Sequence, residues 1–459
     1  MSVLPAERPA NAPVGQPRTA RPRRSRQHPA PSPAPGTTFA ALGVATALVT
    51  ILARDGIITP RPIQAAVLPD ALAGRDILGC AQTGSGKTLS FSLPLVARLA
   101  RGHTMACRPR GLVLVPTREL ATQVEAVLSP LAGAVGLTVA VVFGGTPQRP
   151  QVAALRGRAD IVVACPGRLA DLIGQGHCHL GDVEVSVLDE ADQMADLGFL
   201  PEVRRLLEAT PPEGQRLLFS ATLDGEVDVL ARRFLARPVR HDVDAAGPPA
   251  QIAHYLLTVP PSERAAVVAA LASGEGRALI FTRTRRGASK LARQLTIAGT
   301  PAAELHGDLA QGARSRNLAA FGSGEVHAMV ATDIAARGLH VDGIALVIHA
   351  DPPAEHKAYV HRSGRTARAG AAGTVVTVQT AAQSAEVRAL MRKAGVTPRA
   401  AAAGPGSAVL RSIAGPPARR ITPVAGSARP VLAATQATGS GAVAASGGFR
   451  GRSRQGRRG

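Results

Sequence analysis

The sequence predicts two α/β domains in tandem, each built on a parallel sheet, between two basic tails that we expect to be disordered. Short apolar runs alternate with helical patterns in the manner of βαβ units, first over 39–243 and again over 251–396. A Pro- and Gly-containing segment, 244–250, interrupts the pattern and is interpreted as a linker. A chain of 459 residues is long enough for two such domains with proper cores.

The charge is concentrated at the two ends of the chain. Residues 1–38 contain six Arg and one Glu, and residues 397–459 contain ten Arg and no acid, within a chain of net charge +21. Both segments are rich in Pro, Gly, Ala and Ser and show neither helical nor strand periodicity. Two disordered basic tails favour a polyanionic partner, most simply a nucleic acid.

The first element after the N-terminal tail is a helix, expected from Phe39 to Arg54. The longest apolar stretch of the chain lies within it and is too short to span a bilayer, so we expect a soluble, cytoplasmic protein. The prolines around Arg61 then predict an extended turn, and Gln64 opens the next helix. A Gln side chain can pair with the N6/N7 edge of adenine, although Gln64 alone is equally consistent with a polar helix residue.

A glycine-rich turn between a predicted strand and a predicted helix is the strongest local signal. The apolar run 76–79 leads through the turn into a helix that begins near Lys87. Backbone N–H groups of such a turn can hold phosphate oxygens, Lys87 would reach the β- and γ-phosphates, and Thr88 would ligate Mg²⁺. The residues expected to bind ATP in this loop are Ala81, Gln82, Thr83, Gly84, Ser85, Gly86, Lys87 and Thr88. Because Ala81 replaces the first glycine of the usual pattern, an ordinary β–α turn with a chance Lys-Thr pair is the alternative.

Two adjacent carboxylates follow the apolar run 183–188. Asp189 and Glu190 are therefore expected at the carboxyl edge of a buried strand, where a parallel sheet collects its ligands. Asp189 is suited to hold Mg²⁺, and Glu190 to orient or deprotonate an attacking water. The alternative is that the acids only complement the dipole of the next helix.

Polar signatures end the remaining strands as well. The strands expected in the first domain, besides 76–79 and 183–188, are 111–116, 139–144, 160–165 and 216–220, and those in the second are 278–282, 328–332, 346–349 and 374–378. Near the end of the second series, Arg365 and Arg368 are three residues apart and share one helix face. They are either an exposed basic face or arginine fingers that reach the γ-phosphate when the domains close.

Taken together, these signatures resemble the DEAD-box ATP-dependent RNA helicases of superfamily 2, and we expect a bacterial member. The resemblance covers about residues 39–396 and includes Phe39 and the Gln64 motif. The series continues with AQTGSGKT (81–88), PTREL (116–120), GG (144–145), PGR (166–168), DEAD (189–192), SAT (220–222), HGD (306–308), ATDIAARG (331–338) and HRSGRTAR (361–368).

The resemblance implies two RecA-like domains that close on ATP and single-stranded RNA. By it, Phe39, Gln64 and Gly338 join the ATP site, and Lys87, Glu190, Arg365 and Arg368 are catalytic. Ser220, Thr222 and His361 would couple the nucleotide to RNA. The implied RNA contacts are Arg118, Gly145, Gly167, Arg168 and Thr332.

Four positions depart from the family pattern. Ile57 stands where an aromatic residue usually stacks on adenine, and Cys165 where Thr usually contacts RNA. Ala367 replaces a Gly, and His340 replaces an Asp that touches the ribose, a role that Asp342 could take instead.

The leading functional hypothesis is an RNA-stimulated ATPase that separates short RNA duplexes. The chain has no Trp and only two Tyr, which fits a protein that contacts the sugar-phosphate backbone of RNA rather than stacking on its bases. An RNA clamp or annealing protein is the first alternative, and a DNA helicase the second, which the pair Phe39 and Gln64 disfavours. We expect ATP and Mg²⁺ as cofactors, RNA as partner together with ribosomal or RNA-decay machinery, and no membrane contact.

Overall fold

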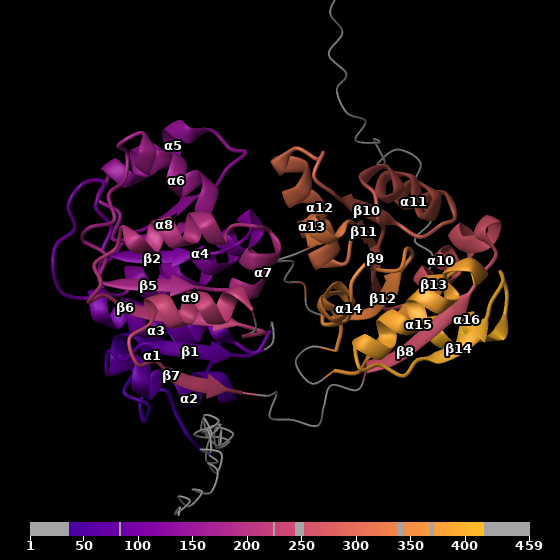
Figure 1. The fold of residues 1–459 in the computed structure, drawn as a ribbon, viewed down its shortest axis with the longest axis horizontal. Coiled ribbons are helices and arrows are strands. Elements are labelled where there is room, and N and C mark those ends of the chain that lie inside the picture. Colours follow the sequence, from indigo (N-terminus) through magenta and orange to yellow (C-terminus); the bar gives the residue numbers. More distant parts are fainter. Residues whose placement is uncertain are drawn as a thin grey trace, which may run out of the picture. The chain divides into compact units, whose positions relative to one another are not determined.

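The computed structural model contains two seven-stranded sheets in tandem, and every pair of neighbouring strands is parallel (Figure 1). The structure describes residues 36–81, 84–223, 225–243, 252–336, 341, 343–367 and 371–416. None of the helices within these ranges is both long and apolar enough to cross a membrane.

The first sheet has the strand order β3-β4-β2-β5-β6-β1-β7. Its strands are β1 (Ile77–Cys80), β2 (Gly111–Leu114), β3 (Val139–Val142), β4 (Ile161–Ala164), β5 (Val185–Leu188), β6 (Gln215–Ser220) and β7 (Val239–Asp242). Its helices are α1 (Thr46–Arg54), α2 (Pro62–Leu72), α3 (Lys87–Leu99), α4 (Arg118–Gly133), α5 (Gln148–Arg156), α6 (Pro166–Gly174), α7 (Ala191–Asp196), α8 (Leu200–Glu208) and α9 (Glu226–Phe234).

The second sheet has the order β10-β11-β9-β12-β13-β8-β14. Its strands are β8 (Ile252–Thr258), β9 (Arg277–Phe281), β10 (Ala302–Leu305), β11 (Ala328–Ala331), β12 (Ile344–His349), β13 (Gly373–Gln379) and β14 (Arg399–Ala402). Its helices are α10 (Arg264–Ala272), α11 (Arg285–Ile297), α12 (Gln311–Ser323), α13 (Asp333–Ala336), α14 (His356–Ser363), α15 (Ser384–Lys393) and α16 (Ala408–Ala414), with short 3₁₀ turns at Pro261–Glu263 and Ala381–Gln383.

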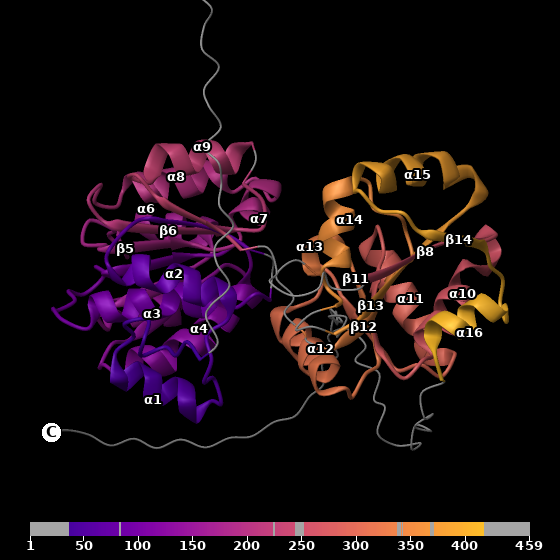
Figure 2. The same ribbon diagram turned by 90° about the horizontal axis from the view of Figure 1, so that it is seen from below.

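Each sheet is buried between two layers of helices. Helices α1 to α4 pack on one face of the first sheet, and α6 to α9 on the other (Figure 2). In the second sheet, α10, α11 and α16 cover one face, and α12 to α15 the other. Burial on both faces explains why the central strands have continuous apolar runs rather than alternating ones.

The topology brings the polar signatures of the first domain together. Strands β5, β6 and β1 are consecutive neighbours, so the segments that follow them share one edge of the sheet. These segments begin at Asp189, Ala221 and Ala81. This edge is where an open parallel sheet binds its ligands.

Three predictions about the elements are corrected by the structure. The first helix begins at Thr46 rather than Phe39, because the chain makes a turn in which Gly43 has φ +88°. The second domain does not end at residue 396: β14 pairs with β8, and Leu410 of α16 is buried in the core. The segment 399–414 was interpreted as tail because it is rich in Ala, Gly, Pro and Ser and shows no clear helical or strand periodicity. Strands β7, β8 and β10 were also missed.

Candidate nucleotide and RNA site

The phosphate loop lies between β1 and α3 and depends on a glycine. Gly86 precedes the first residue of α3 with φ +96°, a conformation that other residues rarely adopt. A Cβ atom at Gly86 would also lie only 2.6 Å from Nε2 of Gln64. The Oγ atom of Ser85 is buried and has no hydrogen-bond partner among the described residues. A loop with an unpaired hydroxyl at a helix N-terminus fits a phosphate group.

Gln64 of α2 is hydrogen-bonded to the phosphate loop. Its Oε1 accepts a hydrogen bond from Arg61 N at 2.8 Å, and its Nε2 donates to Gly86 O at 3.1 Å. The Arg61 side chain donates from Nη1 to Gly84 O at 2.6 Å. Gln64 was predicted as an adenine ligand, and its amide is here used to connect helix α2 to the phosphate loop. Arg61 was not singled out from the sequence, because only its position after Pro60 indicates a structural role.

Lys87 forms a buried ion pair with Glu190. The Nζ and Oε1 atoms are 3.2 Å apart, and the side chains are only 4% and 11% exposed. Burial lowers the pKa of Lys87, but the negative charges of Glu190, Asp189 and Asp192 outweigh this effect, so the net shift is upward. Lys87 is therefore a fixed cation between the phosphate loop and the carboxylates.

Asp189 is fully buried beside this pair. Burial is the largest effect and raises the pKa of the Asp189 carboxyl. The charge of Lys87 lowers this pKa and the charge of Glu190 raises it, and together the three effects give a pKa of about 7. A nearby divalent cation would stabilise the ionised form of this buried carboxylate. Thr88, which follows Lys87 in the chain, could offer its hydroxyl to the same cation. In the part of the chain that the structure describes, no group of three or more His, Cys, Asp or Glu forms a metal site of its own. The oxygen atoms of Asp189 and Thr88 are of the kind that Mg²⁺ takes, one or two from the protein together with phosphates and water.

Glu190 adopts a left-handed backbone conformation. Its φ of 55° and ψ of 50° place it immediately before helix α7, and its N–H donates to Asp189 Oδ1 at 3.0 Å. For a residue with a Cβ this conformation costs roughly 1–2 kcal/mol. Such strain clusters at functional sites, where it aims a side chain.

Asp192 connects the carboxylates to the segment after β6, and the sequence analysis missed it. Its N–H donates to Ser220 Oγ at 3.2 Å, and its Oδ2 accepts from Thr222 N at 3.1 Å. Thr222 Oγ1 also lies 3.4 Å from this oxygen. Ser220 and Thr222 were predicted to couple the nucleotide state to RNA. Both are hydrogen-bonded to Asp192, whose charge acts on Lys87. The only sequence signal for Asp192 was its place in the tetrapeptide 189–192.

The predicted RNA contacts of the first domain lie together. The Arg118 guanidinium packs on Gly145, where an added Cβ would fall 2.1 Å from Nη1 of Arg118. Arg168 donates from Nη1 to Thr146 O at 3.3 Å, next to Gly145. Gly167 precedes Arg168 in the first turn of α6. Two guanidinium groups and glycine backbone thus form a surface suited to a phosphodiester chain.

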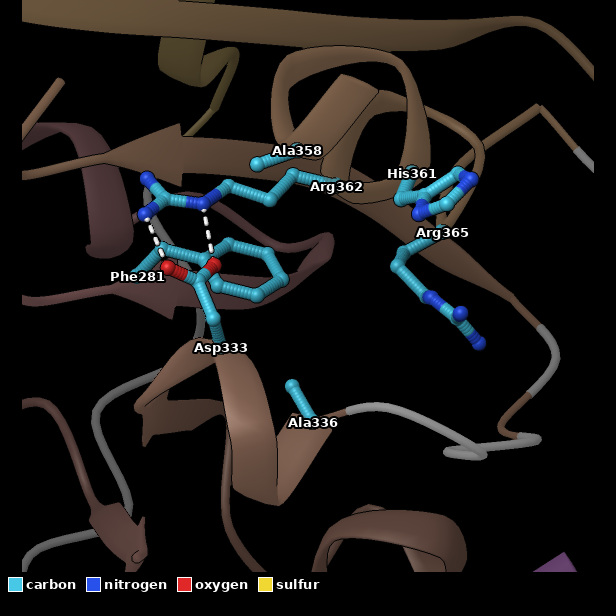
Figure 3. A pocket seen from close by; sticks show the side chains of 7 residues that line it. All are labelled: Phe281, Asp333, Ala336, Ala358, His361, Arg362 and Arg365. Atoms are coloured by element: carbon cyan, nitrogen blue, oxygen red, sulfur yellow. Dashed lines mark hydrogen bonds and ion pairs between the residues drawn. The ribbon is translucent and has the colours of Figure 1, made fainter. Parts of the chain in front are cut away.

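The arginine motif of the second domain surrounds a pocket (Figure 3). Arg362 is pinned: its Nε and Nη2 donate to the two carboxylate oxygens of Asp333 at 2.5 and 2.7 Å, and its Nη1 donates to Asp351 O at 2.9 Å. Its guanidinium also lies over the Phe281 ring, 4.9 Å from the centroid. Arg365 lines the same pocket, and Figure 3 shows it directed away from the Arg362–Asp333 pair.

Helix α14 ends at Ser363 and carries only the first three residues of this motif, so Arg365 lies in the turn after the helix and not on a helix face as predicted. The helix itself is held by contacts with the sheet. Tyr359 is fully buried, and its hydroxyl is 2.8 Å from Nδ1 of His254 on β8. The ring of His349 packs edge-on against Tyr359, with 5.1 Å between centroids. Burial lowers the pKa of His349 well below its ordinary value, with Arg362 adding to the effect, so this imidazole is neutral. The motif therefore lies on a rigid support.

Comparisons with known proteins agree with this geometry. The DEAD/DEAH box helicase family model matches residues 61–230, and the helicase conserved C-terminal domain model matches residues 263–370. DEAD-box ATP-dependent RNA helicase 20 of Arabidopsis thaliana is 37% identical over 359 residues, covering 77% of this chain and 72% of the relative. The chain belongs to the DEAD-box RNA helicase family.

Two further similarities describe this DEAD-box protein. It is 40% identical over 341 residues to DEAD-box ATP-dependent RNA helicase 30 of Arabidopsis thaliana, covering 72% of this chain and 58% of that one. It thus spans less than two thirds of that relative. Its two sheets match the structure of S. cerevisiae Dbp5 bound to RNA and ADP BeF3, with TM-score 0.72, 26% identity, and coverage of 82% and 98%. The RecA-like fold prediction is confirmed, whereas the bacterial origin stays a prediction.

The remaining predicted site residues occupy varied positions in the two domains. Phe39 is 1% exposed and packs in the core of the first domain, and its place in the ATP site stays a prediction. Ile57 is partly buried against the same core. Cys165 precedes α6, and its pKa is raised to about 12, by burial first and then by Glu119. Thr332 follows β11, and His361 lines the second-domain pocket. Gln82, Thr83, Gly338, His340, Asp342 and Arg368 lie outside the described residues.

Proposed function

We propose that this protein hydrolyses ATP in response to RNA and uses the cycle to separate or remodel short RNA duplexes. The observation that carries the proposal is the buried Lys87–Glu190 ion pair beside Asp189, where the phosphate loop leads into α3. A purely structural site would not hold three carboxylates around one lysine, because burying charges is costly. A site that binds a triphosphate and a metal uses a lysine and acidic residues side by side in this way.

Each residue has a distinct task in this proposal. The loop backbone and Lys87 hold the phosphates, and Asp189 with Thr88 would hold Mg²⁺, which neutralises charge on the β- and γ-phosphates. Glu190 orients the attacking water and accepts its proton. Arg365, and Arg368 outside the described part, stabilise charge that develops on the γ-phosphate.

RNA binding reaches the nucleotide through Asp192. Arg118 and Arg168 hold the RNA backbone at the edge where the strands of the first sheet end. Ser220 and Thr222 are hydrogen-bonded to Asp192, two residues from Glu190. A shift of this segment on RNA binding would therefore move the catalytic carboxylate.

An ATP-gated clamp is the second candidate. The C-terminal tail, with eight Arg and no acid in residues 417–459, favours tight RNA binding without a need for unwinding. Both candidates use the same site, and they differ in whether hydrolysis leads to strand separation. Work on ribosomal or RNA-decay particles in the cytoplasm stays a prediction in either case.

The deciding experiment measures two activities on one preparation. ATP turnover is followed with and without single-stranded RNA, and strand separation is followed on a short fluorescent duplex. Turnover that rises with RNA and drives strand separation supports the helicase. RNA-stimulated turnover without strand separation supports the clamp. An ATP turnover rate that is the same with and without RNA would reject both candidates.

A further inference from the structure

Helix α11 of the second domain carries a basic stripe on its outer face, defined here as Arg286, Lys290 and Arg293. All three are exposed, and at 3.6 residues per turn they lie within an arc of about 60°. The buried residues of the helix, among them Leu291 and Leu295, occupy the opposite face. The helix contains no acidic residue.

The charges of the stripe are not neutralised within the described part of the chain. No ion pair of that part involves any of its three residues, whereas nearby acids have other partners. Asp308 pairs with Arg285 at 2.6 Å, and Glu304 is 3.2 Å from His306. Some exposed arginines on other helices do have acidic partners: Arg232 pairs with Asp228 and Arg233 with Glu208, at 2.5 and 2.6 Å.

The stripe is continuous with the functional edge of its own sheet. Helix α11 begins four residues after β9, the strand that lies beside β11 and β12. Its first turn therefore shares an edge with Thr332, which follows β11. From there the 13 residues of the helix lead away from the edge over about 20 Å, at a rise of 1.5 Å per residue.

We propose that the α11 basic stripe is a second RNA-binding surface, which holds the phosphate backbone of the double-stranded part of a substrate whose single strand occupies the family's RNA track. This inference rests on the proposed function. The surface offers point charges at intervals of one helical turn and no aromatic platform, which fits backbone contact rather than base recognition. None of the motifs named in the sequence analysis includes these residues.

The test compares two triple variants of the full chain that lower the net charge equally. The first is Arg286→Gln/Lys290→Gln/Arg293→Gln. The matched control neutralises three exposed arginines that already have acidic partners: Arg205→Gln/Arg232→Gln/Arg233→Gln. Affinity for a hairpin with a single-stranded overhang, and for a single strand of the overhang's length, is measured with a non-hydrolysable ATP analogue from 50 to 200 mM salt.

We expect the stripe variant to bind the hairpin with a salt slope smaller by about two, since each phosphate contact contributes about 0.7–0.9 to it. That corresponds to a roughly twentyfold smaller loss of affinity over this salt range. The control variant should keep the wild-type slope, and the short single strand should not distinguish the two variants. Equal hairpin slopes for both variants would overturn the inference, as would an equal loss of slope on the hairpin and on the short single strand. RNA-stimulated turnover of the wild type, followed in parallel, tests the proposed function separately.

Discussion

Replacing Glu190 by Gln separates catalysis from folding at this site. The amide has the shape of the carboxylate, and its Oε1 can still accept a hydrogen bond from Lys87 Nζ, 3.2 Å away in the structure. It also removes one negative charge from a buried cluster that includes Asp189 and Asp192, so their mutual repulsion falls. The folded state should therefore lose no stability, and the melting temperature should stay the same or rise.

Turnover should respond very differently. An amide cannot take a proton from the attacking water, and a positioned general base contributes roughly 10²–10⁴-fold. The activation free energy should therefore rise by about 3–5 kcal/mol, at 1.36 kcal/mol for each factor of ten. ATP affinity should be retained, because Lys87 and the phosphate loop are unchanged.

The assay combines RNA-stimulated turnover, equilibrium binding of a fluorescent ATP analogue and thermal unfolding of both proteins. Glu190→Asp is the control, since it keeps the charge but shortens the side chain. Turnover by Glu190→Gln within a few-fold of wild type would refute the assignment of Glu190 as the general base. A fall in melting temperature of many degrees would instead refute the charge argument.

Changes at Lys87, Gln64, Asp189 and the C-terminal tail should each have a separate measurable effect. Lys87→Met should lower stability by about 3–5 kcal/mol, because it leaves buried carboxylates without their cation, as measured by urea unfolding. Gln64→Glu should weaken ATP binding and stability by about 1–3 kcal/mol, since an oxygen would face Gly86 O in place of the donor, and Gln64→Met serves as the uncharged control. Asp189 has a folded pKa of about 7 against an ordinary value of 3.8, so the folded state binds a proton that the unfolded state releases, and stability should fall as pH rises through this window. The melting temperature of Asp189→Asn relative to wild type should accordingly increase from pH 5 to pH 7.5, and parallel curves would contradict the shift. Removing residues 417–459 deletes eight Arg and should flatten the salt dependence of RNA affinity, while turnover at saturating RNA survives.

Most central strands were predictable from the sequence, with β8 as the exception, and most edge strands were not. Strands such as β2 and β4 are buried on both faces and are made of consecutive apolar residues. By contrast β7, β10 and β14 lie at the sheet edges, where packing demands less of the side chains. Strand β14 is three alanines after Arg399, a pattern that low-complexity sequence shares.

The site residues were predictable as members of motifs, but their connections were not. Lys87 and Glu190 lie 103 positions apart, and only the sheet order makes them a pair. The same holds for Asp192 and Thr222, whose bond depends on β5 and β6 being neighbours. Gln64 illustrates a different limit: its residue type allowed adenine recognition, while its burial at 2% exposure and its bond to Gly86 were set by the turn at Gly86.

The left-handed backbone at Glu190 has a consequence for engineering the stability of this protein. Gly or Asn would adopt this conformation at lower cost, so selection for stability alone would remove the glutamate. The glutamate therefore carries a conformational cost that its proposed role as general base would account for. A laboratory evolution experiment that screens only for heat resistance should therefore lose Glu190 early, and the resulting proteins would be robust, folded and inactive.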